Sequence, residues 1–471
     1  MNERFAPVLF ISNFSIKETE MLLEEIIAKR VAALNCENLD GNIRHIMKRN
    51  IMDSFASICG SLNDREMLLN FARLVSGEAS GSDLDIWGIQ KRGSFTDTFF
   101  VNSIMARRSD LLSTYLSPNN MGGVHPSDNV ALALILADWR KMNGTQLLIT
   151  VHTMFYLSAA FSSYYNPEPA NYDHDAAATF ITALAIGNVL GCTEEQLVNV
   201  QRIAGMFGLD INQAGIGQIT DWKHCTYASC ALRGLQAAKL ALAGFQAPAE
   251  IYEGNAGVNH FFPHIESFFE PTPDLGRIIF KRWPALVFCQ TPIDVSLDLS
   301  AKISDKKAIE SVTVKTYEVA YRNGALPSAD NPTSRAGRTH SIPYCVATAL
   351  LKPVSYEDFD ESRASDPDLV ELLKRINIVN DPELTKAYPE KSPCVIEITL
   401  KDGTNIRGDR DYPKGDPHDP LSDHEIEEKL KTYFFFAAND SEKDVIIEKL
   451  WKLEEQSSLD WLVLPLKQRL I

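Results

Sequence analysis

Long apolar, alanine-rich stretches with helical spacing dominate the first part of the chain, and they restrict it most strongly to a helical fold. Residues 129–161 form two such stretches, which are separated at Asn143-Gly144. Residues 176–190 are largely apolar all round, residues 223–243 are rich in Ala and Leu, and each of these two stretches stops at a glycine. Helices that are apolar all round are buried, and glycine commonly follows the last turn of a helix. The sequence therefore predicts a large bundle of closely packed helices.

The pattern changes near residue 275. Val312, Val314 and Thr316 alternate with polar or aromatic residues, which predicts a strand with one buried face. Residues 394–400 predict a second strand that enters a tight turn at residues 401–404. Helices are expected between these strands, at 341–351 and 366–376, and charged amphipathic helices follow from Ser422. We expect a mainly α protein, in which a large helical domain built from both chain ends carries a smaller α+β lid. The predicted domains are residues 1–277 together with 416–471, and residues 278–415.

Length and charge restrict the class of protein further. A chain of 471 residues exceeds one ordinary core, which favours two domains. The formal net charge of -16 argues against nucleic acid or an anionic membrane as partner, although an anionic metabolite can bind in a locally basic pocket. No run of about 18 apolar residues predicts a membrane span. The N-terminus lacks the layout of a secretory signal or a transit peptide. Cytoplasm is therefore expected, with mitochondria as the alternative in a eukaryotic host.

Eight cysteines are scattered along the chain, and none forms a CxxC pair. Structural zinc and the common iron–sulfur spacings are therefore not supported, and we expect reduced, mostly buried thiols. The same observation disfavours an iron–sulfur hydratase. No metal and no cofactor are predicted.

Several separated positions carry side chains that are suited to acid–base work on a carboxylate. His125 lies between a glycine pair and Pro126, which predicts a turn, and catalytic residues are often on loops; a surface histidine is the alternative. Asp110 and Thr114 are four residues apart and would share one face of a helix. The alternative for these two residues is a helix cap in a solvated loop.

His174 stands between Asp173 and Asp175 just before a buried apolar stretch. Either aspartate could cap that helix, and the helix N-terminus would favour a neutral imidazole, the form that a general base requires. Lys223 begins the next alanine-rich helix, where the helix dipole disfavours a cation. An anionic substrate group at this helix end would explain the lysine.

A third group of candidate residues lies where the sequence pattern changes and beyond. Lys281 is at the predicted domain change, where clefts form, although a basic surface patch is the alternative. Arg338 and His340 precede Tyr344 at the start of a predicted helix. Arginine suits carboxylate binding, and tyrosine can donate a proton.

In their order and spacing, several segments resemble the MmgE/PrpD superfamily over about residues 50 to 450. The segments are His-Pro-Ser-Asp-Asn at 125–129, Ala-Asp-Trp at 137–139, Arg-Thr-His-Ser-Ile-Pro-Tyr at 338–344, and Tyr-Pro-Lys-Gly at 412–415. The 2-methylcitrate dehydratase branch is the most similar. The resemblance implies a helical domain, an α+β lid, a homodimer, and cofactor-free chemistry on di- and tricarboxylates between the two domains.

The resemblance also implies the site residues. In the decarboxylase branch of the superfamily the site contains an Asp-x-x-x-Thr segment, two histidines, two lysines and a tyrosine. Here these fall on Asp110, Thr114, His125, His174, Lys223, Lys281 and Tyr344. The chain departs from the family in having one acidic residue rather than two in the first segment, after an unusual Arg107-Arg108. It also has Arg-Thr-His-Ser at 338–341 where Arg-Asp-His-Cys is common.

The expected activity is dehydration of 2-methylcitrate or a similar 2-hydroxy acid. Asp110, His125, His174, Lys223 and Tyr344 are the expected catalytic residues, and Thr114, Lys281, Arg338 and His340 are expected to bind substrate. One histidine would take the C–H proton, the other or Tyr344 would protonate the leaving hydroxyl, and Asp110 would orient a histidine. Decarboxylation of cis-aconitate and epimerisation of an amino-dicarboxylate are alternatives with the same proton chemistry. A carboxylate-binding homologue without catalysis is an alternative of another class.

Overall fold

The computed structural model describes residues 21–35, 39–75, 84–89, 91–116, 123–164, 171–258, 273–325, 327–437 and 439–471. Nineteen α-helices and seven short strands lie within these ranges, which confirms the mainly α class. The segment through residue 20 and Cys36 lie outside the described residues. The other seven cysteines are free thiols, and six of them are buried. No described helix combines the length and the apolar character needed to cross a bilayer.

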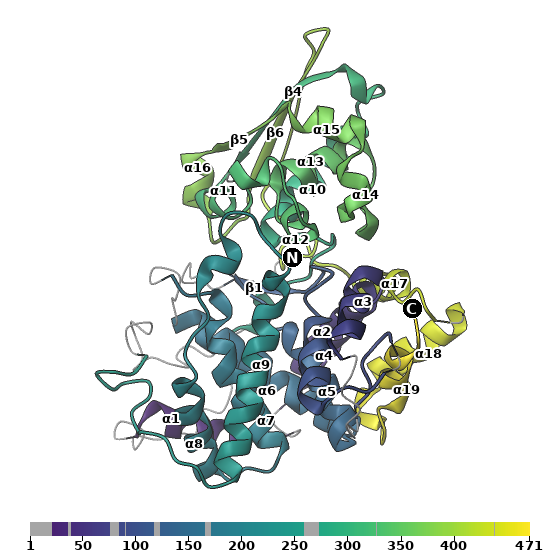
Figure 1. Cartoon of the computed structure of the whole chain (residues 1–471). Coiled ribbons are helices and arrows are strands. Elements are labelled where there is room, and N and C mark those ends of the chain that lie inside the picture. Colours follow the sequence, from purple (N-terminus) through teal and green to yellow (C-terminus); the bar gives the residue numbers. More distant parts are fainter. Residues whose placement is uncertain are drawn as a thin grey trace.

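The first nine helices form the lower body of the molecule in Figure 1. They are α1 (Leu23–Ala33), α2 (Gly41–Ser61), α3 (Arg65–Leu74), α4 (Phe95–Ile104), α5 (Asp128–Arg140), α6 (Gly144–Tyr164), α7 (Ala178–Val189), α8 (Glu194–Met206) and α9 (Trp222–Leu242). Helix α7 packs on α9, and Gly234 allows the close approach, because a Cβ there would lie 2.3 Å from Thr182 Oγ1. The helix ends predicted at Gly191 and Gly244 are confirmed, since both glycines adopt positive φ.

The C-terminal helices return to this body. They are α17 (Asp423–Tyr433), α18 (Asp440–Trp451) and α19 (Asp460–Val463). Helix α17 packs along α2, and residues of all three join the same hydrophobic core as the first nine helices. Figure 1 shows the C-terminal segment beside α2 and α3, so that both ends of the described chain contribute to one helical body.

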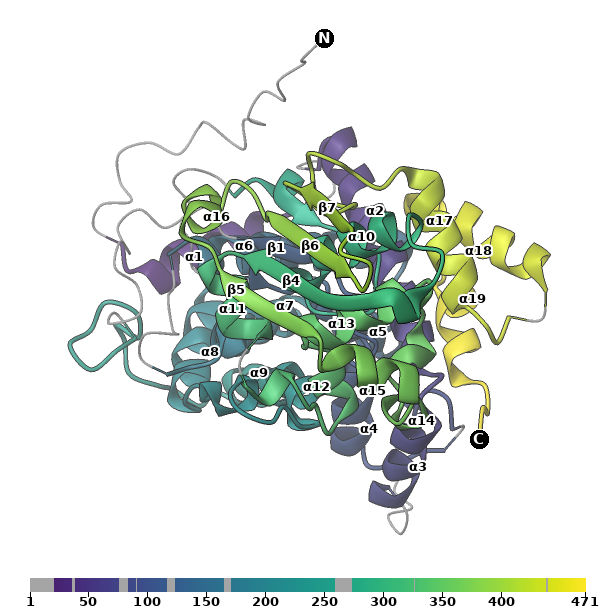
Figure 2. The same ribbon diagram turned by 90° about the horizontal axis from the view of Figure 1, so that it is seen from above.

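A second hydrophobic core belongs to the α/β part at the top of Figure 1. Its helices are α10 (Val287–Ser300), α11 (Glu318–Gly324), α12 (Arg335–Thr339), α13 (Ile342–Leu351), α14 (Glu361–Ala364), α15 (Pro367–Leu373) and α16 (Pro382–Ala387). Its strands are β4 (Ile309–Thr316), β5 (Ile376–Asn380), β6 (Cys394–Leu400) and β7 (Asn405–Arg410), in the order β5-β4-β6-β7. Strand β4 pairs parallel to β5 and antiparallel to β6. We call this part the lid; Figure 2 shows its sheet lying across the helical body.

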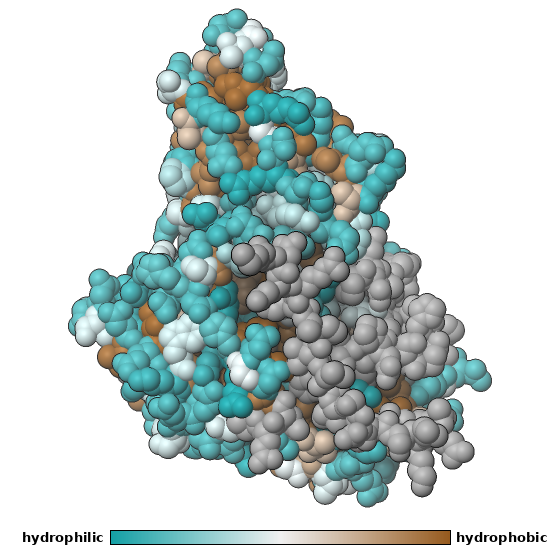
Figure 3. All heavy atoms as spheres, turned by 180° about the vertical axis from the view of Figure 1, so that it is seen from behind, coloured by the Kyte–Doolittle hydropathy of each residue, from teal (hydrophilic) through white to brown (hydrophobic). Residues whose placement is uncertain are grey.

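The chain leaves the helical body and returns to it at adjacent points. Phe280 N–H donates to the carbonyl oxygen of Gly415 at 2.9 Å, so the outgoing and returning segments are hydrogen bonded. Gly415 has φ of 104°, and a Cβ there would lie 1.9 Å from the Phe280 carbonyl oxygen. Only glycine fits this crossing without a shift of the backbone. Seen from behind, the described surface is largely hydrophilic, with apolar side chains showing mainly on the lid (Figure 3).

Candidate active site

A small three-stranded sheet brings distant candidate residues together beneath the lid. Its strands are β1 (Thr114–Leu116), β2 (Gly123–Val124) and β3 (Ile278–Ile279), with β1 in the centre. Thr114 begins β1 and pairs with Ile279, His125 follows β2 directly, and Lys281 is two residues beyond β3. The sheet therefore fixes three of the predicted site residues on one rigid support.

His125 lies in a turn, as the sequence predicts, because Asp128 N–H donates to its carbonyl oxygen. Its Nδ1 lies 3.3 Å from the Ser113 carbonyl oxygen and 3.1 Å from Thr114 Oγ1. A carbonyl oxygen only accepts hydrogen bonds, so Nδ1 carries the proton and Nε2 keeps its lone pair. Burial, and then the positive charges of Arg107 and Lys281, hold the pKa of His125 well below its usual range. The imidazole is thus neutral, with Nε2 available as a base.

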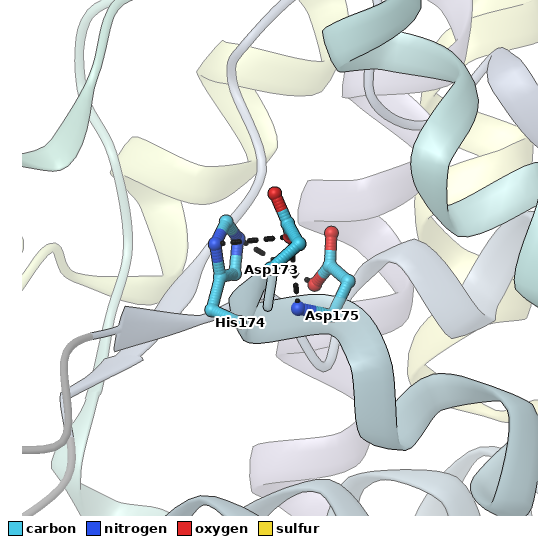
Figure 4. A group of neighbouring side chains, drawn as sticks. All are labelled: Asp173, His174 and Asp175. Atoms are coloured by element: carbon cyan, nitrogen blue, oxygen red, sulfur yellow. Dashed lines mark hydrogen bonds and ion pairs between the residues drawn. The ribbon is translucent and has the colours of Figure 1, made fainter. Parts of the chain in front are cut away.

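His174 lies on a single 3-10 turn, His174–Ala177, at the start of α7, and its two aspartate neighbours flank the ring (Figure 4). Asp173 caps the turn by accepting from Asp175 N–H, and its carboxylate is 3.2 Å from His174 Nδ1. The other oxygen of Asp173 lies 3.3 Å from Lys223 Nζ. Burial alone would raise the pKa of Asp173, but His174 and Lys223 hold it far below its usual value. The His125 and His174 ring centroids are 5.9 Å apart.

Lys223 stands at the start of α9, in the predicted place, but its helix-end position has an explanation within the protein. Asp173 supplies the negative charge that the sequence analysis predicts for a substrate group. Lys223 is 7% exposed, and its pairing with Asp173 joins the beginning of α9 to the His174 turn.

Asp110 forms the second charged cluster. Its Oδ1 lies 2.6 Å from Nζ of the fully buried Lys281, and its Oδ2 lies 3.5 Å from His340 Nδ1. Burial would raise the pKa of the carboxyl, but Lys281 and then His340 keep it below the ordinary value. The segment from Asp110 to Thr114 is not helical, so these two residues do not share a helix face. Asp110 has φ of 55° after a turn, and Thr114 is extended, because β1 must pair with both β2 and β3.

His340 comes from the end of α12 in the lid. Its Nδ1 is 2.8 Å from the Ala336 carbonyl oxygen, which fixes the proton on this nitrogen. Burial lowers the pKa of His340 to about 4, against the attraction of Asp110. The ring also lines a small cavity between the lid and the segment that precedes α9. His340 therefore brings a side chain of the lid next to Asp110.

Two other predicted residues face another part of the lid. The Tyr344 hydroxyl donates to the Asp358 carbonyl oxygen at 2.8 Å. Arg338 donates from Nε to the Phe359 carbonyl oxygen at 2.8 Å, and its Nη1 pairs with Glu361 at 3.0 Å. Both side chains hold the 358–361 segment, and no described contact joins either of them to Asp110, His125 or His174. Sequence order placed them near His340 but could not show which way they point.

Arg107 connects the two histidine segments, and the sequence singled it out only as unusual. Its guanidinium donates to Asp128 at 2.5 and 3.2 Å and also to Asp175, with all three side chains buried. Asp128 is three residues after His125, and Asp175 Oδ1 lies 3.5 Å from His174 Nε2. Burial raises the pKa of Asp128 to about 7; Arg107 opposes this rise, and the negative charge of Asp175 adds to it.

Lys429 supports the site from the helical body, and no local sequence pattern indicates it. This buried lysine of α17 donates to Asp53 Oδ1 at 2.6 Å. It also donates to the carbonyl oxygens of Leu111 and Lys281 at 2.9 and 2.8 Å. Lys429 thus fixes the backbone next to both Asp110 and Lys281.

A partly open cavity lies next to the two histidines of the body. Helices α6 and α7 contribute to its wall, His125, His174 and Asp175 line it, and its empty volume is about 460 Å³ including the space open to solvent. We call this space the inner cavity. Asp173, His174 and Asp175 present ligand atoms within 4.8 Å of one another, so they could hold a cation. Lys223 and Arg107 already pair with the two carboxylates, which disfavours a metal there.

The arrangement can move a proton beside a carboxylate. It combines a neutral histidine with a free lone pair, a second histidine between carboxylates, and two buried lysines.

Comparison with known proteins gives two family matches and several relatives. Residues 25–268 match the MmgE/PrpD N-terminal domain, and residues 283–453 match the MmgE/PrpD C-terminal domain. The chain is similar to cis-aconitate decarboxylase of Homo sapiens, 22% identical over 433 residues, which cover 87% of each chain. It is also similar to 2-methylcitrate dehydratase of Escherichia coli K12, 27% identical with 71% of this chain and 73% of the relative covered. For 2-methylcitrate dehydratase of Cupriavidus necator the identity is 25%, with coverage of 59% and 63%.

Proposed function

The chain belongs to the MmgE/PrpD family, and from this premise we propose that it is a hydro-lyase acting on 2-methylcitrate or a closely related 2-hydroxy tricarboxylate. The relatives named 2-methylcitrate dehydratase support the reaction class. The observation that carries the proposal is His125, a neutral imidazole with its Nε2 lone pair free beside buried positive charge. The proposed product is the cis-aconitate-type alkene, which would serve propionate catabolism.

In the proposed reaction, His125 Nε2 takes the proton from the carbon next to a substrate carboxylate. The electron pair left by the C–H bond forms the double bond, the neighbouring C–O bond breaks, and the hydroxyl leaves as water after receiving a proton. His174 delivers that proton, since its ring lies 5.9 Å from His125 and between two carboxylates. General acid–base catalysis of this kind contributes about 10²–10⁴-fold. No net oxidation occurs, so the reaction needs no redox partner.

The lysines stabilise the negative charge that develops on the substrate carboxylate during proton removal. Lys281 holds its charge beside Asp110, and Lys223 holds its charge beside Asp173. Asp110 orients His340 rather than His125 or His174, and Thr114 contacts His125 Nδ1. His340 is proposed to bind substrate from the lid. Tyr344 and Arg338 are proposed to position the 358–361 segment instead of transferring a proton, because their polar atoms are engaged there.

Decarboxylation is a second candidate, and one observation favours it. The similarity to human cis-aconitate decarboxylase spans 87% of both chains, more than the dehydratase similarities cover. Loss of a carboxylate as carbon dioxide needs the same lysines and a proton donor at the carbanion. Epimerisation of an amino-dicarboxylate would use the same two histidines. We also propose a cytoplasmic homodimer, with mitochondria as the alternative in a eukaryotic host.

A proton NMR time course tests the proposal. The purified protein is incubated with 2-methylcitrate, citrate or cis-aconitate in deuterated buffer, beside the His125→Ala and His174→Ala variants. Alkene signals from 2-methylcitrate that both variants lack support dehydration. Itaconate signals from cis-aconitate would replace it with decarboxylation. Deuterium incorporation without net product would point to epimerisation, and binding without any change would favour the carboxylate-binding homologue.

A further inference from the structure

The inner cavity has walls that are mostly apolar. Phe161 contributes from α6, Ala177 from the 3-10 turn, and Ala178 and Ile181 from the beginning of α7. The ring of Tyr227 faces it from α9. These side chains form a wall suited to hydrocarbon, because burying apolar surface is favourable and burying an unpaired charge is not.

The polar groups of the cavity are almost all occupied by one another. Asn129 donates to the Pro126 carbonyl oxygen and to Ser158 Oγ, and it accepts from the Tyr227 hydroxyl at 2.8 Å. Ser158 in turn donates to the Met154 carbonyl oxygen. Apart from the ring nitrogens of His125 and His174, the exception is Ser162, whose buried Oγ has no hydrogen-bond partner among the described residues. One free hydroxyl therefore faces an apolar cavity, and it can bond a neutral ligand group.

The charges at the cavity exclude a carboxylate. Asp175 is the charged residue of the lining, and a second carboxylate beside it would be repelled. The nearest cation in contact with this wall is Arg107, whose guanidinium is shared by Asp175 and Asp128. Lys223 and Lys281 pair with Asp173 and Asp110 and do not line the cavity. Positive charge for the substrate carboxylates is therefore found outside the cavity.

We propose that the inner cavity binds an uncharged branch on the substrate carbon that loses its proton, and that it accepts a branch longer than methyl. His125 both lines the cavity and is the proposed base, so the carbon that it deprotonates carries the group that enters. The substrate class is a 2-hydroxy tricarboxylate with an alkyl branch on the adjacent carbon. Ser162 additionally accommodates a hydroxyl at the end of that branch. This inference rests on the proposed function and names the substrate class for the same site.

Turnover of a graded substrate series tests the inference. We expect kcat/KM to increase from citrate to 2-methylcitrate and again to 2-ethylcitrate, about tenfold or more per added carbon, as a methylene in an apolar pocket typically contributes. Equal values for all three, or a preference for citrate, would overturn the inference. With 2-(hydroxymethyl)citrate, Ser162→Ala is expected to lower kcat/KM about tenfold, while its value for 2-ethylcitrate stays within a factor of two.

Two cavity variants act in opposite directions, so a folding defect in one leaves the other informative. Ala178→Leu fills the cavity and is expected to reduce kcat/KM for 2-ethylcitrate at least tenfold, with little change for citrate. Ile181→Ala enlarges it and is expected to favour 2-ethylcitrate over 2-methylcitrate more strongly than the wild type does. Asn188→Leu, at the other end of α7 and outside the cavity, is the matched control and should leave the ratios unchanged.

Binding measurements separate failure of the inference from failure of the proposed function. If no compound turns over, the proposed function fails, and the dissociation constants of citrate and 2-ethylcitrate are measured by calorimetry. Tighter binding of 2-ethylcitrate that Ala178→Leu abolishes would still support the cavity assignment. Equal binding of both compounds, or binding of neither, would overturn it.

Discussion

The ion pairs around the candidate site in the helical body and the pairs of two lid arginines differ in how exposed they are. In the pairs of the body that lie at the candidate site or beneath it both partners are buried, as in Lys281–Asp110, where the side chains are 0% and 5% exposed, and in Lys429–Asp53. In the lid a buried arginine pairs with a side chain that reaches solvent. Arg338 is 3% exposed, whereas its partner Glu361 is 81% exposed. The chain therefore contains pairs with both charges buried and pairs with one charge in contact with water.

The difference indicates what each region requires. Removing two charges from water costs several kcal/mol per ion, and the attraction between the charges rarely exceeds this desolvation penalty. The fully buried pairs of the body therefore add little stability compared with apolar residues. They surround His125 and His174, where fixed charges are useful to the proposed chemistry. In the lid pairs the exposed partner stays in water, so the desolvation penalty is small, and these pairs hold the 358–361 segment at the surface.

The largest effect is expected where the body holds its proposed base. His125→Ala should reduce kcat for the proposed dehydration about 10²–10⁴-fold, because the group that receives the proton is lost. Steady-state kinetics with 2-methylcitrate measures this. His45→Ala is the control, since that histidine is 45% exposed and pairs with Asp423 far along the chain. Equal losses in the two variants would remove His125 from the reaction.

The buried pair beneath the site should give the next effect. Lys429→Met leaves the Asp53 carboxylate buried without its cation, which costs about 3–5 kcal/mol of unfolding free energy. Urea unfolding measures the change. Adding Asp53→Leu in the same chain should recover most of the loss, because both charges are then gone. No recovery in the double variant would mean that the hydrogen bonds from Lys429 to Leu111 and Lys281 matter more than the charge.

Acid should destabilise the protein through histidines that are buried in the neutral form. Burial lowers the pKa of His340 to about 4. Between pH 6.5 and 4 the imidazole is therefore protonated in the unfolded chain but neutral in the folded protein. The stability is full above pH 6.5 and is lost as the pH falls through this window, by about 3 kcal/mol for this residue. Unfolding curves at several pH values test this, and His340→Gln should flatten the dependence. An unchanged slope in that variant would assign the loss to other groups, such as His125.

The smallest effect is expected in the lid. Glu361→Gln removes the exposed partner of Arg338 and should change the unfolding free energy by less than about 1 kcal/mol, as exposed pairs usually do. Thermal unfolding measures it, with Glu371→Gln as a matched change of another exposed pair on the lid. A loss as large as that of Lys429→Met would contradict the contrast between the two regions.

Local sequence patterns predicted the helices well, because caps, breaks and apolar periodicity lie within a few residues of one another. The separation of α5 from α6 at Asn143-Gly144 and the turn after β6 are confirmed. The helix expected at 366–376 is shorter, because the chain turns after α15 and enters β5 at Ile376. Strand β5 pairs parallel to β4, a contact that no local pattern shows.

The candidate site was less predictable, because its residues meet through contacts between distant parts of the chain, which local patterns do not show. The two histidines, two lysines and Asp110 come together as the family resemblance implied, although their roles stay proposals. The Arg107 bridge and Lys429 depend on contacts across the fold, and Lys429 is 376 residues from Asp53. Side-chain direction could not be predicted from the sequence either. Tyr344 and Arg338 are close to His340 in the chain, but their side chains bind another segment of the lid.

The packing of α17 on α2 has a consequence for how the protein is made. When the ribosome has released α2, the helix that covers it has not been synthesised, and the whole lid must emerge first. Until then Asp53 has no ammonium partner, and the face of α2 that meets α17 is open to solvent or to chaperones. The helical body therefore completes its core only after the lid has left the exit tunnel. A chain stalled on the ribosome before residue 423 would lack α17, and its helical core would be incomplete.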